Sequence, residues 1–385
     1  MAGFLEGATE KASRMKKVIG FLICTAWMML VLTASAAYAE RMVLIADLHM
    51  TADRTAFETT LTAIERMGAD SDVLVFLGDN TNNGKMEEHT AFLAYLESVQ
   101  QTTGKKVYVI PGNHDLTGNT TPEVFAARYA RFGWNEAFAK DPDSASYAVM
   151  TPEGTCLLML DTNAYDPKTR MTEYGETSKA LVAWTRTVLE GLPEGCQTLV
   201  FGHYPLFPTG DGRDSTRNSG AMAEVLTRYH VTGYFCGHRH SNYTLHSDGL
   251  RQINVGVPTG YPAWAGSLEK EETAWHYRVR PLYDTNGDTW KQLAENARAL
   301  ALRMGEGSLA QTEFEGDREA IEWFADAFMA QAEGRMDEER TELLKRAGCA
   351  KWRKAQVRSV TKEWILGLLE SETEDVRDVL LPFSR

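Results

Sequence analysis

Residues 107–115 read Val-Tyr-Val-Ile-Pro-Gly-Asn-His-Asp, so an apolar run of strand length passes directly into polar side chains. Continuous apolar runs of this length are typical of strands that are buried on both faces of a sheet. The segment Gly112-Asn113-His114-Asp115 is more specific than an ordinary turn, because Asn and His rarely follow a buried strand without a functional role. We therefore interpret the end of this strand as part of a site.

Four other apolar runs end in the same way, in residue types that bind metals in proteins. These are 42–46 before Asp47-Leu48-His49, 73–77 before Gly78-Asp79-Asn80, 198–201 before Gly202-His203-Tyr204-Pro205, and 233–236 before Gly237-His238-Arg239-His240. Sites in layered α/β folds form at the carboxyl ends of strands. One such segment alone can be a polar turn, but the five together predict a metal site at one sheet edge.

The nine histidines of the chain divide into two groups. Five lie in these segments. Of these, His238 and His240 are two residues apart and would point to opposite faces of an extended strand, so we expect a kink assisted by Gly237 to bring both to the site. The other four follow no ligand spacing, and we interpret them as structural or surface residues: His89, His230, His246 and His276.

The remaining sequence predicts a layered domain followed by helices. A further apolar run, 156–160, has strand length, and residues 54–67, 86–101 and 177–189 have helical periodicity. This alternation predicts an α/β fold for the catalytic domain, residues 40–285. Beyond residue 289 strand signals stop, and four or five helices fit near 289–304, 315–332, 336–347 and 356–370. We therefore predict a small helical C-terminal domain at 286–385.

Residues 1–39 have the layout of a secretory signal peptide. A positive stretch at 11–17 precedes an uncharged, mostly apolar run, and Ala37-Tyr38-Ala39 forms a cleavage site before Glu40. We expect the protein to be exported, as a secreted, periplasmic or cell-surface protein. An uncleaved membrane anchor is the alternative, because 18–39 carries no charge. A translation start at Met15 would give a short positive region directly before the apolar run, and residues 1–14 would then lie outside the protein.

Composition and charge limit the kinds of partner. The 385 residues are 43% hydrophobic and 24% charged, which is ordinary for a globular protein, and the net charge is -13. Removing residues 1–39 makes it -15, which argues against binding to a nucleic-acid duplex. Four cysteines remain without CxxC spacing, so buried thiols are favoured and disulfides stay open: Cys156, Cys196, Cys236 and Cys349.

The five segments together resemble the motif set of the calcineurin-like metallophosphoesterase superfamily, over about residues 42–281. The resemblance implies a four-layer α/β/β/α sandwich with a two-metal centre at one edge of the sheets. It also implies a role for each motif residue. Asp47, His49 and His240 would hold one metal, Asn113, His203 and His238 would hold the other, and Asp79 would bridge both. Catalysis would involve His114, just outside the metals, oriented by Asp115.

Such a centre suits the hydrolysis of phosphate esters. Two metal ions offset the negative charge of the ester and activate a bridging water as hydroxide. Mixed imidazole and carboxylate ligands suit manganese, iron or zinc better than calcium. Purple acid phosphatases carry a metal-binding tyrosine three residues after the bridging aspartate, but this chain has Asn82 there. A tyrosinate–iron site is therefore not expected.

We expect an exported phosphoesterase that acts on a small phosphate ester and slightly prefers phosphodiesters. The preference follows from residues 79–84 and 248–256, which are similar to bacterial cyclic-nucleotide phosphodiesterase-like members. A phosphomonoesterase such as a nucleotidase is the alternative. A non-catalytic scaffold on the same fold is a third hypothesis, but none of the motif residues of that fold is missing.

Two segments are candidates for substrate contacts. Loop 206–220 follows His203 and offers Arg213 and Arg217 to an anionic group, although a solvated loop is an equal alternative. In segment 257–264, Tyr261 or Trp264 could stack on a base or sugar. For these two aromatic residues we favour packing in the core.

Overall fold

Two β-sheets of the computed structural model carry the motif segments. The first sheet has the order β15-β14-β13-β1-β2-β3. Its strands are β1 (Arg41–Ile45), β2 (Val73–Leu77), β3 (Lys106–Ile110), β13 (Trp264–Lys270), β14 (Ala274–Pro281) and β15 (Asp378–Pro382). Strands β1, β2 and β3 are parallel, whereas β13, β14 and β15 join antiparallel. The structure describes residues 40–208, 216–247, 249–357, 361–370 and 377–383.

The second sheet has the order β11-β12-β10-β9-β6-β5-β4. Its strands are β4 (Ala139–Lys140), β5 (Tyr147–Met150), β6 (Cys156–Met159), β9 (Thr198–Phe201), β10 (Gly233–Cys236), β11 (Tyr243–Ser247) and β12 (Leu250–Asn254). Strands β6, β9, β10 and β12 run parallel to one another. A separate hairpin, β7 (Asn163–Asp166) and β8 (Met171–Gly175), lies between β6 and β9 in the chain.

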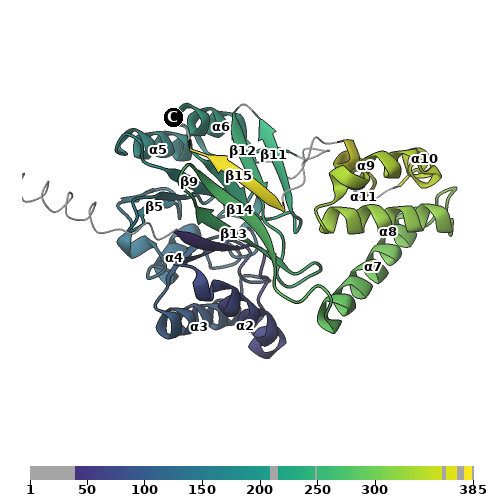
Figure 1. Ribbon diagram of the computed structural model, residues 1–385, viewed down its shortest axis with the longest axis horizontal. Helices are drawn as coiled ribbons and strands as arrows, with labels where there is room; N and C mark the ends of the chain where they lie inside the picture. The colour runs from purple at the N-terminus through teal and green to yellow at the C-terminus, as the bar shows by residue number, and fades with distance from the viewer. Residues whose placement is uncertain (1–39, 209–215, 248, 358–360, 371–376, 384–385) are drawn as a thin grey trace, which may run out of the picture. The chain divides into compact units, whose positions relative to one another are not determined.

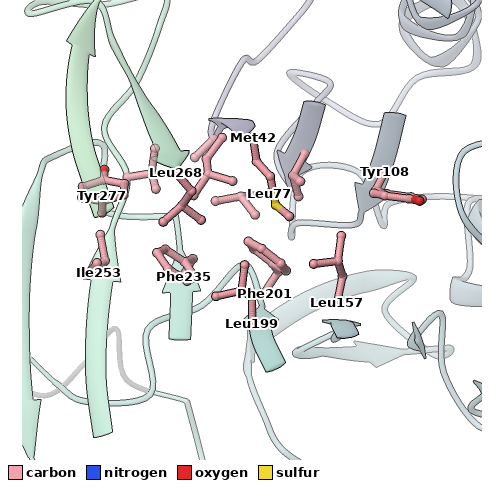
Figure 2. Packing of buried hydrophobic residues seen from close by; sticks show 14 of the residues in the cluster. Met42, Leu77, Tyr108, Leu157, Leu199, Phe201, Phe235, Ile253, Leu268 and Tyr277 are labelled. Carbon is pink, nitrogen blue, oxygen red and sulfur yellow. The ribbon is translucent and has the colours of Figure 1, made fainter. Parts of the chain in front are cut away.

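Side chains from both sheets form the central core. Met42 and Leu44 of β1 point into it together with Phe201 of β9 and Phe235 of β10, and all four are buried. Figure 2 shows residues of the two sheets facing each other across this layer. The alternate residues of β1, Val43 and Ile45, pack on the opposite face of the sheet. Both faces are therefore buried, which explains why the strand sequences are continuously apolar.

Helices cover the outer face of each sheet (Figure 1). Helices α2 (Glu58–Met67), α3 (Met86–Thr103) and α4 (Pro122–Arg128) pack on the first sheet, and α5 (Lys179–Glu190) and α6 (Ser219–Arg228) pack on the second. The predicted helix at 54–67 begins as a 3-10 turn, Arg54–Phe57, and continues as α2. Similar short turns lie at Gly68–Asp70 and Trp134–Glu136. The layers are α/β/β/α, as expected from the sequence.

The C-terminal region contains five described helices with their own core. These are α7 (Asp288–Leu309), α8 (Arg318–Ala332), α9 (Met336–Lys345), α10 (Ala347–Lys354) and α11 (Thr361–Glu370). Trp323 and Trp352 are fully buried there, and their indole nitrogens donate to the carbonyls of Leu343 and Ala320. The helical part of the tail agrees with the sequence analysis.

The end of the chain differs from that expectation, because residues 378–382 form a strand. This strand, β15, pairs antiparallel with β14 at the edge of the first sheet. Its pattern of alternately exposed and buried residues spans only five residues, which is too short to stand out after a helical region. Residues Glu40–Arg385 form one compact unit. The domain boundary at 285/286 stays a prediction.

Two sequence expectations concern the cysteines and the membrane. Cys156, Cys196, Cys236 and Cys349 are free thiols, and Cys196 is the only one of these four that is not buried. Among the described residues, no helix is both long and apolar enough to cross a membrane. The predicted signal peptide, residues 1–39, lies outside the described residues.

Candidate metal centre

Five strand ends from the two sheets meet at one place. Asp47 and His49 follow β1, Asp79 follows β2, Asn113 and His114 follow β3, His203 follows β9, and His238 and His240 follow β10. Their donor atoms form three overlapping groups that could each hold a metal ion: Asp47 with His49 and His240, His49 with Asp79 and His114, and Asp79 with His203 and His238. These groups contain six of the seven predicted ligands, and the seventh, Asn113, contacts His203 and His238.

The first predicted ligand set lies on the β1 side of the centre. Nε2 of His240 is 3.5 Å from Oδ1 of Asp47 and 3.0 Å from Nε2 of His49. Asp47 is fully buried, and its carboxylate also accepts the backbone N–H of His238 at 2.9 Å. This hydrogen bond links the β1 segment to the β10 segment and sets their spacing.

The second predicted set lies on the β9 side. Oδ1 of Asn113 is 3.1 Å from Nε2 of His203 and 3.2 Å from Nδ1 of His238. Nδ1 of His203 is 2.9 Å from the carbonyl oxygen of Leu77, so this nitrogen carries the proton and donates. When the ring is neutral, the proton therefore stays on Nδ1 and Nε2 is the nitrogen available to a metal.

Asp79 lies between the two sets. Its Oδ2 is 3.6 Å from Nε2 of His49 and 3.4 Å from Nε2 of His203, while Oδ1 accepts the backbone N–H of His114 at 2.8 Å. A carboxylate in this position can offer an oxygen to both ligand sets. This is the placement that the sequence analysis predicted for a bridging residue.

The backbone at the centre is unusual. Five of the predicted ligands have positive φ angles: Asp47 (55°), His49 (48°), Asp79 (49°), His238 (70°) and His240 (50°). Non-glycine residues rarely adopt this conformation, and those that do are concentrated at functional sites. The kink between His238 and His240 is thus made by the histidines themselves. Our expectation that Gly237 supplies it is wrong, since Gly237 has no positive φ.

Gly237 is required for a different reason, the close approach of two strands. A Cβ atom at this position would lie 2.6 Å from Oδ2 of Asp47. Only a residue without a side chain leaves room for the Asp47 carboxylate against the β10 segment.

The charges of the centre favour a cation. Burial raises the pKa of Asp79 and lowers that of His203, but their mutual attraction outweighs burial in both. The pKa of Asp79 therefore lies well below its usual range, and that of His203 rises to about 9. Burial lowers the pKa of His238 to about 4 and also lowers that of His49. His49 and His238 are therefore neutral and Asp79 is ionised, as metal binding requires, whereas His203 must release a proton when a metal binds.

The donor set fits a pair of transition-metal ions. It combines imidazole nitrogens, two carboxylates and one amide oxygen, with neighbouring donors 3.0–3.6 Å apart. This spacing suits donors that share an ion at bond lengths of about 2.0–2.2 Å. Imidazole with carboxylate suits manganese, iron or zinc.

His114 and Asp115 do not interact as expected. Nδ1 of His114 is 2.6 Å from the carbonyl oxygen of Asn82. The fully buried Asp115 carboxylate instead accepts hydrogen bonds from Asn80, Thr81 and Gly112. The expectation that Asp115 orients His114 is therefore wrong, because its oxygens already serve the backbone around the two ligand segments.

Three of the four candidate substrate residues are described, and none has a described contact with the predicted ligands. Arg213 lies outside the described residues. The guanidinium of Arg217 lies 3.3 Å from the ring centroid of Tyr174. The Tyr261 hydroxyl donates to Glu333 at 2.5 Å, and both Tyr261 and Trp264 contact the ring of Trp290 in α7. None of the contacts described for these two residues reaches the predicted ligands, which agrees with the packing role we favoured.

Two residues near the centre were missed by the sequence analysis. The ring of Tyr204 lies 4.2 Å from that of His238 between centroids, and Tyr204 is buried. Its position directly after His203 is the only sequence signal for this role. Asn82 was noted only for not being a tyrosine, whereas its backbone carbonyl holds His114. A backbone contact of this kind leaves no signature in residue type.

A cavity of about 590 Å³ adjoins the centre. Its lining includes Asn113 and His114, and also residues 169–172 of the β7–β8 hairpin. A substrate bound at the metal residues would extend into this space.

Comparison with known proteins supports the fold and the family resemblance described above. The sequence model of the family described as calcineurin-like phosphoesterase matches residues 40–242, which is more than half of the chain. Among solved structures, a dimetal phosphatase from Danio rerio superposes with a TM-score of 0.52 over 64% of this chain and 97% of that chain. The two are 16% identical, so this likeness shows the fold.

Curated relatives include both phosphatases and a phosphodiesterase. The tartrate-resistant acid phosphatase type 5 of Oryctolagus cuniculus is 27% identical over 160 residues, or 39% of this chain and 48% of that protein. The "Probable glycerophosphodiester phosphodiesterase GpdQ" of Arcobacter nitrofigilis is 25% identical over 174 residues, or 44% of this chain and 56% of that protein. The chain spans about half the length of these relatives.

Proposed function

We propose that this chain, which belongs to the calcineurin-like phosphoesterase family, is a hydrolase of phosphate esters that works with two metal ions. The observation that carries the proposal is the position of Asp79 between two ligand sets built from five strand ends. Asp47, His49 and His240 would hold one ion, and Asn113, His203 and His238 would hold the other.

Two bound ions would supply a nucleophile at neutral pH by lowering the pKa of water from about 16 to about 7, and would clamp the phosphate oxygens. The residues of the chain then orient the reaction. Attack forms a new P–O bond to the water oxygen and breaks the bond to the alcohol. His114 donates its Nδ1–H to the Asn82 carbonyl, and in its imidazolium form it would transfer the proton on Nε2 to the departing oxygen and become neutral.

Within this reaction we propose a slight preference for phosphodiesters, with manganese, iron or zinc as the ions. Asn82, at the position of the purple acid phosphatase tyrosine, and the similarity of residues 79–84 to cyclic-nucleotide phosphodiesterase-like members support this choice. The relative named as a glycerophosphodiester phosphodiesterase is consistent with it. A phosphomonoesterase is the second candidate, since other relatives are acid phosphatases.

The test is an assay of purified protein with manganese, zinc or iron on bis-p-nitrophenyl phosphate and p-nitrophenyl phosphate. We expect hydrolysis of both, faster for the diester. The reverse ratio would support the monoesterase. No hydrolysis of either ester, with two metal ions per chain confirmed by elemental analysis, would refute the hydrolase. That result, with a partner protein bound equally by wild type and an Asp47/Asp79 double variant, would favour a scaffold.

The variant Asp79→Asn tests the bridging role. Losing the carboxylate should lower kcat at least about 100-fold, because the centre stabilises the transition state through this ligand. Asp141→Asn is the matched control, since Asp141 is also a buried carboxylate but, among the described residues, its side chain accepts only from Asp143 and Ser144 of its own loop. Similar activity of Asp79→Asn and the control would refute the bridging role.

We also propose that the protein is exported after cleavage behind Ala39. The uncharged, mostly apolar run followed by Ala37-Tyr38-Ala39 before Glu40 supports this proposal. N-terminal sequencing of protein recovered outside the cytoplasm of a producing cell would test this. A sequence beginning at Glu40 is expected, and an intact N-terminus in the membrane fraction would indicate the anchor instead.

A further inference from the structure

The cavity beside the centre is placed to hold the alcohol portion of a substrate. It is bounded by Asn113, a predicted ligand, and by His114, whose proposed role is to protonate the departing oxygen. A phosphate group at the metal residues would therefore leave its alcohol portion directed toward this space. Residues 169–172, which also line this space, belong to the β7–β8 hairpin, which no sequence motif singled out.

The hairpin is held rigidly against the segment that follows His114. Arg170 contributes most of this attachment, because its carbonyl accepts the N–H of Gly118 at 2.8 Å and its Nε donates to the Gly118 carbonyl at 3.0 Å. The Tyr165 hydroxyl donates to the same carbonyl at 3.1 Å. Thr117 and Met171 form an additional β-bridge. The wall of the cavity is thus a fixed surface rather than a free loop.

The guanidinium of Arg170 has donors to spare. Its Nε is used by Gly118, but in the part of the chain that the structure describes its two terminal nitrogens make no ion pair and no hydrogen bond. Thr172 also lines the cavity, but its hydroxyl oxygen is buried and has no surface that a ligand there could reach. The exposed Arg170 side chain lines the cavity, so an anionic group of a ligand there could accept hydrogen bonds from its terminal nitrogens.

The other lining residues make the cavity suitable for an anion. Those described are amides, hydroxyls, a histidine, a glycine and a methionine, and none carries a carboxylate. This is notable in a chain with a net charge of -13. A guanidinium presents two parallel N–H donors that match a carboxylate or phosphate group.

We propose that Arg170 forms an anion subsite for the alcohol portion of the substrate, so that the enzyme favours phosphate esters whose alcohol carries its own carboxylate or second phosphate. The inference rests on the proposed function, because the subsite matters only if a phosphate ester is bound next to it. It narrows that function to a class of substrates.

The test compares substrates that differ only in one anionic group, phenyl phosphate and 4-carboxyphenyl phosphate, or their methyl diesters if these react faster. Wild type is expected to have the higher kcat/KM for the carboxylated ester. Arg170→Ala should lower kcat/KM for that ester by about 10- to 100-fold, the range for one charge-assisted hydrogen-bonded pair. The loss for the phenyl ester should be clearly smaller, because that ester offers the guanidinium no anion to bind.

Lys168→Ala is the matched control. Lys168 lies in the same hairpin turn, is exposed and carries the same charge, but does not line the cavity. We expect it to behave like wild type on both esters. Equal losses in Lys168→Ala and Arg170→Ala would refute a specific subsite, and so would equal losses of Arg170→Ala on both esters. Arg170→Lys should retain part of the preference.

Binding of 4-hydroxybenzoate to metal-free protein, measured by calorimetry, gives a readout independent of turnover. Wild type should bind it at least about 10-fold more tightly than Arg170→Ala does, and equal affinities would overturn the subsite. The outcome is distinguishable from failure of the proposed function. An enzyme that hydrolyses phenyl phosphate but ignores the carboxylate has the function without the subsite, whereas one that hydrolyses neither ester lacks the function.

Discussion

Replacing Asp115 by Asn would separate a structural role from a catalytic one. Oδ2 of Asp115 accepts the backbone N–H of Asn80 at 3.1 Å, Nδ2 of Asn80 at 2.9 Å and the N–H of Gly112 at 2.9 Å. Oδ1 accepts the backbone N–H and the hydroxyl of Thr81 at 2.9 and 2.8 Å. Asparagine has the same shape as aspartate, but one of the two acceptor oxygens of the side chain is replaced by an amide nitrogen that donates.

The size of the effect follows from these five hydrogen bonds. The new side-chain amide nitrogen destabilises the fold least if it takes the position of Oδ1. There the Thr81 hydroxyl can rotate and accept a hydrogen bond from it. Only the Thr81 N–H then loses its acceptor, and a buried donor without a partner costs about 1–3 kcal/mol. The hydrogen bonds to the remaining oxygen are no longer strengthened by the carboxylate charge, which reduces their strength to about half. We expect Asp115→Asn to lower the free energy of unfolding by about 2–4 kcal/mol.

The assay is urea unfolding of the metal-free proteins, combined with metal content and kcat of the loaded ones. Metal affinity should fall as well, since Asp115 holds the segments that carry Asp79 and Asn113. His114→Asn is the comparison. It should change stability by less than about 1 kcal/mol while lowering kcat. The reasoning is refuted if Asp115→Asn unfolds like wild type and only the pH profile of kcat changes, since that result is expected if Asp115 orients His114.

Two other predictions use different parts of the structure. A Cβ at Gly112 would lie closer than 3.0 Å to the backbone nitrogen and Oδ1 of Asp79, so Gly112→Ala should displace the bridging residue and lower kcat on the order of 100-fold. Gly307→Ala, where a Cβ meets open space in a helix, should leave kcat unchanged and stabilise by about 0.5–1 kcal/mol; equal kcat values for the two variants would contradict the argument. Burial lowers the pKa of His276, but its contacts with Asp378 and Glu271 outweigh burial and raise the pKa above 6.5. The stabilisation of β15 by this histidine is therefore complete below pH 6.5 and is lost as the pH rises through the higher folded-state value. The difference in unfolding free energy between wild type and His276→Gln should be larger at pH 6 than at pH 9, and a difference that does not vary with pH would show that the contact carries no charge.

The strands and their site residues could be predicted from local sequence. Strands β2, β9 and β10 have the predicted limits because a strand buried on both faces must be apolar along its whole length. The polar residue that ends such a strand then marks the sheet edge. Since the strands at the centre of each sheet are parallel, their carboxyl ends meet at that edge, and the ligands of both sets could be named before their geometry was known.

The contacts between these elements depended on the folded chain. Nothing in the sequence indicated that the Asn82 carbonyl would hold His114, that Asp115 would serve three other residues, or that Arg170 would reach the cavity beside the centre. The same is true of β15, which becomes a strand by pairing with the edge of a sheet formed about 100 residues earlier. Residue type and spacing specify what a segment can become and which chemistry it carries. Which groups it meets is set by segments distant in sequence, through hydrogen bonds and packing that exist only after the chain has folded.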